Sequence, residues 1–276
     1  MRKSILITGC SSGIGYDVAH GLHRAGWRVF ATCRQEKDVQ RLQNEGLESC
    51  QLDYGDEDSI ASALDWVLEQ TGGTLDALYN NGAFACPGAA EDLPRAALRE
   101  IFEVNVLGYH DLTRRVIPVM RAQGHGYIIN CSSILGIVVA PWRSAYNASK
   151  FALEGLTDTL RIEMRDTNIK VVLLEPGPVT SRIRANSVPY FEKWIDWQNS
   201  PRAQQYRDAL IPRLYAKKEG TDLFELPPSA VTQKLLRILN SDNPRPRYYV
   251  TKATHIMGAL RRILPSRALD WILAKG

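Results

Sequence analysis

Two side chains four residues apart could work together as an acid–base pair. Tyr146 and Lys150 belong to the motif Tyr-Asn-Ala-Ser-Lys, which lies in a segment of helical period. Residues at i and i+4 share one face of a helix, so the ammonium would lie beside the phenol. A neighbouring positive charge stabilises a tyrosinate and lowers the pKa of the phenol. We therefore interpret Tyr146 as a general acid or base acting on a carbonyl or an alcohol.

The spacing alone is unspecific, because Tyr248 and Lys252 repeat it. Their pattern is that of a strand, in which four residues span roughly 13 Å, so that pair cannot cooperate. Two polar residues add to the first pair. Ser133 ends a strand pattern thirteen positions before Tyr146 and either hydrogen-bonds a reacting oxygen or merely terminates the strand. Asn105 interrupts an apolar helical stretch and is either functional or a satisfied core amide.

The elements that must position these residues alternate along the chain. Strand patterns occupy 4–8, 27–33, 47–53, 75–81, 127–133, 170–177 and 246–251. Helical patterns occupy 14–25, 36–44, 56–71, 95–123 and 144–167. This alternation predicts an α/β fold of Rossmann type, with a doubly wound parallel sheet between two helical layers. Ligands bind such sheets at the carboxyl ends of the strands, where Ser133 is expected.

A glycine-rich turn, Thr8-Gly9-Cys10-Ser11-Ser12-Gly13-Ile14-Gly15, follows the first strand. Glycines let a pyrophosphate approach the backbone, and the next helix offers free N–H donors. The spacing is not G-x-G-x-x-G, and a plain strand-to-helix connection is the alternative. After the second strand, Arg34 stands where an acid would bind a 2′-hydroxyl. Its guanidinium, helped by Ser12, suits a 2′-phosphate, so we expect NADP(H); the alternative is a solvated arginine.

In their order along the chain, these motifs resemble the short-chain dehydrogenase/reductase family over about residues 1–180 and 246–251. The matching residues are TGCSSGIG (8–15), Asp53, Asn80-Asn81-Gly82-Ala83, Asn105, Ser133, YNASK (146–150) and Pro176-Gly177-Pro178-Val179-Thr180. The family usually has Asn-Asn-Ala-Gly where this chain has Asn80-Asn81-Gly82-Ala83. The sequence looks closest to NADP-dependent aldehyde reductases and to retinol- and hydroxysteroid-dehydrogenase-like members.

The resemblance implies a role for each matching residue. The implied catalytic residues are Asn105, Ser133, Tyr146 and Lys150. The implied cofactor-binding residues are Gly9, Ser11, Ser12, Gly13, Ile14, Gly15, Arg34, Asp53, Asn81, Gly82, Tyr146, Lys150, Pro176, Gly177, Val179 and Thr180. The implied reaction is NADPH-dependent reduction of an apolar aldehyde or ketone to the alcohol. An oxidative alcohol, retinol or hydroxysteroid dehydrogenase and a non-catalytic NADP(H) sensor are the alternatives.

A substrate-loop insertion is expected at 181–226. It carries the aromatic residues Tyr190, Phe191, Trp194, Trp197, Tyr206, Tyr215 and Phe224. With Phe84, Pro141 and Trp142 near the expected mouth of the site, they suggest an apolar pocket, or else they pin small helices to the body. Substrate contacts are expected from Ser133, Tyr146, Phe84 and Trp142.

Length and composition give the remaining expectations. The chain has 276 residues, 45% of them hydrophobic, a net charge of +4 and five cysteines without C-x-x-C spacing. We expect one domain over 1–276, reduced thiols in the cytoplasm, no nucleic-acid partner and a homo-oligomer. No run suffices for a membrane span, and no metal site is expected. The basic helical tail 253–276, including Lys275, packs on protein or makes a weak peripheral membrane contact.

Overall fold

The computed structural model describes residues 2–216 and 223–274, whose strands form one parallel sheet. The strands are β1 (Ser4–Ile7), β2 (Arg28–Cys33), β3 (Glu48–Gln51), β4 (Ala77–Asn80), β5 (Gly126–Cys131), β6 (Ile169–Glu175) and β7 (Arg247–Tyr249). Their order is β3-β2-β1-β4-β5-β6-β7, and every pairing is parallel. The predicted doubly wound sheet is confirmed, and its strand order reverses between β1 and β4.

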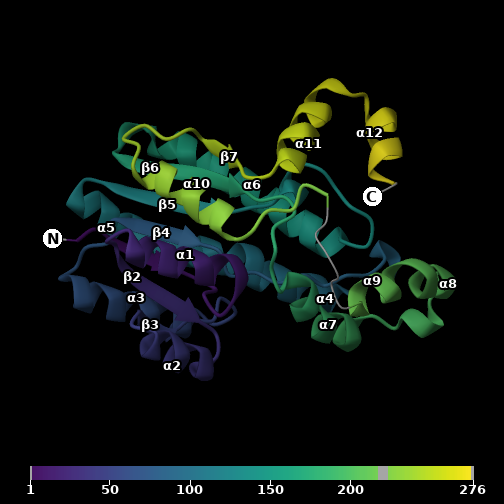
Figure 1. Cartoon of the computed structure of the whole chain (residues 1–276), viewed down its shortest axis with the longest axis horizontal. Coiled ribbons are helices and arrows are strands. Elements are labelled where there is room, and N and C mark those ends of the chain that lie inside the picture. Colours follow the sequence, from purple (N-terminus) through teal and green to yellow (C-terminus); the bar gives the residue numbers. More distant parts are fainter. Residues whose placement is uncertain (1, 217–222, 275–276) are drawn as a thin grey trace.

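Helices cover both faces of this sheet (Figure 1). One face carries α1 (Gly13–Arg24), α2 (Glu36–Asn44) and α10 (Ser229–Leu239), and the other carries α3 (Glu57–Thr71), α5 (Gly108–Gln123) and α6 (Ser144–Glu163). Successive side chains of a strand point to opposite faces, so Ile5 and Ile7 pack in the first layer and Leu6 in the second. Both core layers are thus supplied by apolar strands buried on both sides.

The remaining helices lie beyond the sheet, at the right of Figure 1. They are α4 (Arg95–Phe102), α7 (Ile183–Trp194), α8 (Ala203–Gln205), α9 (Ile211–Tyr215), α11 (Lys252–Ile263) and α12 (Ser266–Leu273). The short helices expected in the insertion are present in its described part; 217–222 and Lys275 lie outside the described residues. The helices of the tail are separated at Pro265, the residue before α12. In the ranges that the structure describes, no helix could cross a membrane.

The predicted helix over 95–123 is two helices joined by one wider turn. Helix α4 ends at Phe102, Glu103–Leu107 form a π-helix, and α5 begins at Gly108. A Cβ on Gly108 would lie 2.5 Å from the Tyr54 Cβ, so α5 begins in close contact with Tyr54. Asn105, at the centre of the π-helix, is fully buried. Apolar periodicity does not reveal one extra residue in a single turn.

Helix α10 is not among the sequence-based expectations, yet it closes one face of the sheet beside α1. Val231, Leu235 and Ile238 on α10 are 0% exposed. A Cβ on Gly21 of α1 would lie 2.3 Å from the Thr232 Cγ2, so the Thr232 side chain packs directly on the backbone of α1. The apolar residues of α10 recur at helical spacing, and this was the available signal.

Leu235→Ala should therefore lower the free energy of unfolding by about 2–5 kcal/mol, because it opens a cavity between α10 and the sheet. Ile263→Ala is the control: this side chain is 76% exposed, and its loss should change stability by less than about 0.5 kcal/mol. Urea denaturation followed by circular dichroism measures both. Equal losses would show that α10 does not belong to the core.

Candidate active site

The residues proposed for catalysis meet where β5 ends and α6 begins. The Lys150 ammonium of α6 is buried and donates to the Cys131 carbonyl oxygen at the end of β5, at 2.8 Å. The Lys150 Nζ lies 5.6 Å from the ring centre of Tyr146, one helical turn earlier. Ser133 is the second residue after β5, and its Oγ accepts from the Leu135 N–H at 3.1 Å. The expected i, i+4 arrangement is therefore present on a helix that is fastened to the sheet.

The charge state of the tyrosine depends on opposing effects. Burial raises the pKa of Tyr146, whereas a hydrogen bond with the Ser133 hydroxyl and the positive charge of Arg143 act to lower it. Arg143, three residues before Tyr146, was not singled out in the sequence, although its charge beside the motif was a signal. The lowering of this pKa by Lys150 stays a prediction, since burial dominates here.

Asn105 fixes the π-helix against the active-site side of α6. Its amide oxygen accepts from the Phe84 N–H at 3.1 Å, and its amide nitrogen donates to the Phe84 carbonyl at 2.9 Å and to the Ser149 hydroxyl at 3.2 Å. Ser149 in turn donates to the Tyr146 carbonyl at 2.9 Å. The buried amide group of Asn105 thus has hydrogen-bond partners for its oxygen and its nitrogen, and it also connects the loop after β4 to the helix of Tyr146.

The glycine-rich turn between β1 and α1 fits a bound dinucleotide. Gly9 and Gly13 have φ of 69° and 60°, which glycine adopts readily. A Cβ on Gly9 would lie 2.5 Å from the Gly82 Cα, and one on Gly15 would lie 2.3 Å from the Gly9 carbonyl oxygen. Ser12 is the N-cap of α1, and its side chain makes no cap hydrogen bond. The turn therefore presents bare backbone and a helix N-terminus, as a pyrophosphate requires.

Hydrogen bonds of Thr8, which follows β1, link it to the loops that follow β3 and β4, beside this turn. Its hydroxyl accepts from the N–H groups of Asn81 and Gly82, at 2.9 and 3.1 Å, and shares a 2.8 Å hydrogen bond with the Tyr54 hydroxyl. The Asn81 side chain donates to the Thr8 carbonyl at 3.0 Å. Asp53 accepts from the Gly55 N–H at 3.0 Å, in the loop after β3. Four residues expected to bind the cofactor (Asp53, Asn81, Gly82, Gly9) thus lie at one edge.

The segment Pro176–Thr180 runs from β6 across the same edge. The Pro176 carbonyl accepts from the Ile134 N–H at 2.8 Å. A Cβ on Gly177 would lie 2.1 Å from the Thr251 Oγ1. Val179 pairs with Leu226, and the Thr180 N–H donates to the Leu226 carbonyl at 3.0 Å. This segment, which carries four of the expected cofactor-binding residues, is therefore held by residues just beyond β5 and β7 and by the end of the insertion.

Arg34 follows β2 at the other end of the site. Its guanidinium Nη1 donates to the Tyr190 hydroxyl of α7 at 2.9 Å. Tyr190 stacks on Phe84, with ring centres 3.9 Å apart. The insertion thus contacts both the residue expected to bind a 2′-phosphate and a residue expected to bind substrate.

Trp142 lies in the loop that precedes α6, the helix of Tyr146. Its φ is 63°, a conformation that bulky residues rarely adopt. The Gly88 N–H donates to its carbonyl at 3.0 Å, and its ring lies 4.8 Å from that of Tyr206. The insertion aromatics Tyr190, Phe191, Trp194, Trp197 and Tyr206 share this apolar cluster. They pack on the body of the protein, which was the alternative to a pocket.

The family model described as "short chain dehydrogenase" matches residues 3–190. This chain is a short chain dehydrogenase.

Three relatives of this dehydrogenase support the assignment. The uncharacterized oxidoreductase YbbO of Escherichia coli is 37% identical over 273 residues, which cover 99% of this chain and 94% of that protein. The 17-beta-hydroxysteroid dehydrogenase type 6 of Rattus norvegicus is 32% identical, over 99% of this chain and 88% of that protein. The retinol dehydrogenase 8 of Bos taurus is 29% identical, over 97% and 87%. The resemblance to hydroxysteroid- and retinol-dehydrogenase-like members is confirmed.

The fold agrees with solved structures of the family. A short-chain dehydrogenase from Streptomyces avermitilis superposes with a TM-score of 0.78 and 26% identity, over 99% of this chain and 93% of that chain. Family and fold together make this protein an oxidoreductase with an NAD(P)-binding fold that acts on CH–OH groups.

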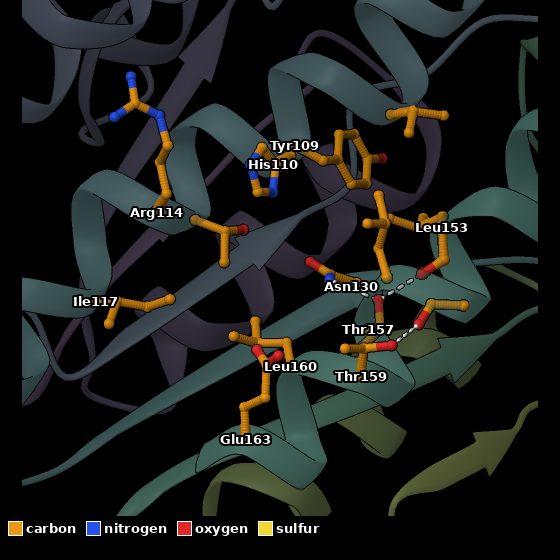
Figure 2. A pocket seen from close by; sticks show the side chains of 14 residues that line it. Tyr109, His110, Arg114, Ile117, Asn130, Leu153, Thr157, Thr159, Leu160 and Glu163 are labelled. Atoms are coloured by element: carbon orange, nitrogen blue, oxygen red, sulfur yellow. Dashed lines mark hydrogen bonds between the residues drawn. The ribbon is translucent and has the colours of Figure 1, made fainter.

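A hollow of about 340 Å³ between α5 and α6 lies away from this site. Figure 2 shows Tyr109 and His110 of α5 facing Leu153, Thr157 and Leu160 of α6 across it. Asn130 of β5 forms part of the wall and donates to the Thr157 hydroxyl at 2.9 Å. The residues that line the hollow come from the π-helix, α5, α6 and β5 and include none of Ser133, Tyr146 and Lys150, so the chemistry of this dehydrogenase lies elsewhere. Within the described residues, no cluster of metal-binding side chains occurs.

Gly15→Ala should lower the free energy of unfolding of this dehydrogenase by about 1–3 kcal/mol, because the added methyl would collide with the Gly9 carbonyl. Gly155→Ala is the matched control on α6, where a Cβ meets nothing within 4 Å; it should gain up to about 1 kcal/mol from helix propensity. Thermal unfolding distinguishes them, and a neutral Gly15 variant would contradict the close packing of the turn.

Proposed function

We propose that this dehydrogenase reduces an apolar aldehyde or ketone to the alcohol with NADPH. The observation that carries the proposal is the placement of Tyr146 and Lys150 on one face of α6, with the ammonium held at the end of β5 beside Ser133. A catalytic set of this kind has no use in a protein that only senses NADP(H). An oxidative reaction would use the same residues in reverse.

The proposed mechanism divides the work among four side chains. Ser133 and Tyr146 hydrogen-bond the carbonyl oxygen of the substrate, and Tyr146 donates the proton that makes it a hydroxyl. Lys150 stabilises the tyrosinate that remains and binds the nicotinamide ribose. Asn105 holds the π-helix and the loop after β4 in place, through the hydrogen bonds described above. The bound cofactor would supply the hydride that the carbonyl carbon receives.

The cofactor would lie along the carboxyl edge of the sheet. In the proposal, the turn Gly9–Gly15 binds the pyrophosphate, Asp53 and Asn81 contact the adenosine, and Val179 and Thr180 contact the nicotinamide amide. NADP(H) is favoured because Arg34 follows β2 and the next acid is Glu36, in the first turn of α2. The Arg34 guanidinium already donates to a hydroxyl oxygen, that of Tyr190, and a phosphate would be a stronger acceptor.

The substrate class is proposed from the apolar residues around the site. Phe84 packs in one cluster with Tyr146 and stacks on Tyr190, and Trp142 packs on Tyr206. The names of relatives that act on hydroxysteroids or retinol favour a bulky apolar carbonyl. A cytoplasmic location, a single domain, a homo-oligomer and a weak membrane contact through the tail stay predictions.

Tyr146→Phe should reduce kcat/KM for carbonyl reduction by about 10²–10⁴-fold, because the proton donor is removed. NADPH binding, followed by fluorescence, should persist. Tyr248→Phe is the control, since Tyr248 repeats the spacing to a lysine but lies on β7. Turnover of Tyr146→Phe at the wild-type rate would contradict the assignment of Tyr146 as the proton donor.

Arg34→Ala should weaken NADPH binding by about 10- to 100-fold and leave NADH binding unchanged, because only the 2′-phosphate loses its charged partner. Arg28→Ala, at the opposite end of β2, where Arg28 pairs with Glu48 at 2.7 Å, is the control. Isothermal titration with both nucleotides measures the effect. Native enzyme that binds both equally would contradict the NADP(H) preference.

A further inference from the structure

One arginine joins three carboxyl groups behind the candidate site. The Arg247 guanidinium of β7 donates to Glu154 and Asp158 of α6, and at 2.6 Å to Glu175 at the end of β6. We call these four residues the carboxyl cluster. Glu175 is fully buried and Glu154 is 7% exposed, whereas Asp158 is partly exposed. The mechanism proposed above does not use them.

The carboxyl cluster reaches the strand end that holds the catalytic lysine. Glu154 lies one helical turn after Lys150 on α6. Lys150 donates to the Cys131 carbonyl, and the next residue, Ser132, lies against Glu154. Both side chains crowd Gly136: a Cβ there would lie 2.5 Å from the Ser132 Oγ and 3.0 Å from the Glu154 Oε1. The Glu154 carboxyl group thus lies at the end of β5, beside the site of Lys150.

Arg161 of α6 also pairs with Asp158, so two guanidinium groups face the three carboxyl groups, and one carboxyl group keeps a proton. Burial, with the nearby Glu154, raises the pKa of Glu175 to about 8. Burial also raises the pKa of Glu154, but the Ser132 hydroxyl and Arg247 act against it. Glu175 is therefore the carboxyl group that holds the proton at neutral pH, and we assign the negative charge to Glu154, which the Arg247 guanidinium binds. Tyr249 of β7 faces Glu175 and Glu154, and Arg262 of α11 lies near Tyr249.

The buried ammonium of Lys150 needs a negative charge nearby to keep its proton. In the described part of the chain its ammonium bonds to a neutral carbonyl and makes no ion pair. Burial lowers its pKa to about 8, and Cys131 and Glu154 act to raise it. The Cys131 thiol stays neutral, because burial raises its own pKa. Tyr109 and Tyr146 present ring faces to the ammonium, at 5.2 and 5.6 Å. Glu154 is thus the anion that supports the charge of Lys150.

We propose that Glu154 is a positioning residue for the Tyr146–Lys150 pair: its buried carboxylate, fixed by Arg247, keeps the Lys150 ammonium charged among neutral neighbours. This rests on the proposed function, in which Lys150 stabilises the tyrosinate and binds the nicotinamide ribose. Only the charged lysine does both. The pH range in which the enzyme is active would then depend on Glu154, a residue that touches neither substrate nor cofactor.

Glu154→Gln keeps the shape of the side chain and removes its charge. The pKa of Lys150 then falls, so the lysine loses its proton at a lower pH than in the wild type. The alkaline limit of kcat/KM should move down by about one pH unit, with activity near pH 6 within about two-fold of wild type. The pH above which NADPH binding weakens, followed by fluorescence, should move with it. An unchanged limit in both measurements would overturn the proposal.

Asp158→Asn is the matched control, because it removes the charge of the outer carboxylate that Arg247 and Arg161 bind and leaves Glu154 in place. It should lower thermal stability without moving either pH limit. If the two variants lose stability alike and neither limit moves, Glu154 is merely structural. If Glu154→Gln does not fold, Glu154→Asp serves instead, because its shorter side chain moves the carboxylate away from Lys150. It should lower both pH limits by a smaller amount, and unchanged limits would count against the proposal. Should the wild type reduce no carbonyl, the proposed function fails, and the NADPH titration still tests Glu154.

Discussion

The candidate site depends on one buried hydrogen bond, from the Lys150 ammonium to the Cys131 carbonyl. Taking an ammonium out of water costs several kcal/mol, so the contact persists only because the surrounding packing imposes it. That contact fastens α6 to the end of β5, and Ser149 on the same helix is linked to Asn105 in the π-helix. The tyrosine is thereby positioned by the sheet and two buried helices, which hold a geometry more closely than a loop does.

The nucleotide side of the site rests on a different kind of contact. There the Thr8 hydroxyl and the bare backbone of the glycine turn bring the ends of β1, β3 and β4 within hydrogen-bonding distance. Small residues, not large ones, decide the geometry. Gly82, where the sequence departs from the family pattern, is the residue that Gly9 approaches. A Cβ on Gly82 would lie 3.3 Å from the Gly9 Cα, a tight contact that a small shift relieves, whereas a Cβ on Gly9 would lie only 2.5 Å from the Gly82 Cα.

Much of this could be predicted from the sequence, because strand and helix periods and the order of motifs are local properties. The sheet, most helices and the pairing of Tyr146 with Lys150 follow from them. What could not be predicted involves residues far apart in the chain or a subtle change of helical period. Arg247 meets Glu154 only because β7 pairs with β6, and α10 is identified as a core helix only beside α1. The hydrogen bond of Arg34 to Tyr190 joins segments 156 positions apart.

The π-helix at Glu103–Leu107 fits one extra residue into a single wide turn, so the helix after it keeps its register. Loss of one residue from this turn would leave a continuous α-helix in which Tyr109, Leu112 and Val116 still face the core. It would remove the bulge in which Asn105 is held against Phe84. Loss of one residue within α5 would instead turn everything after it by about 100°. A one-codon deletion in the π-helix would therefore disturb the site and spare the core, whereas one in α5 would disrupt the core.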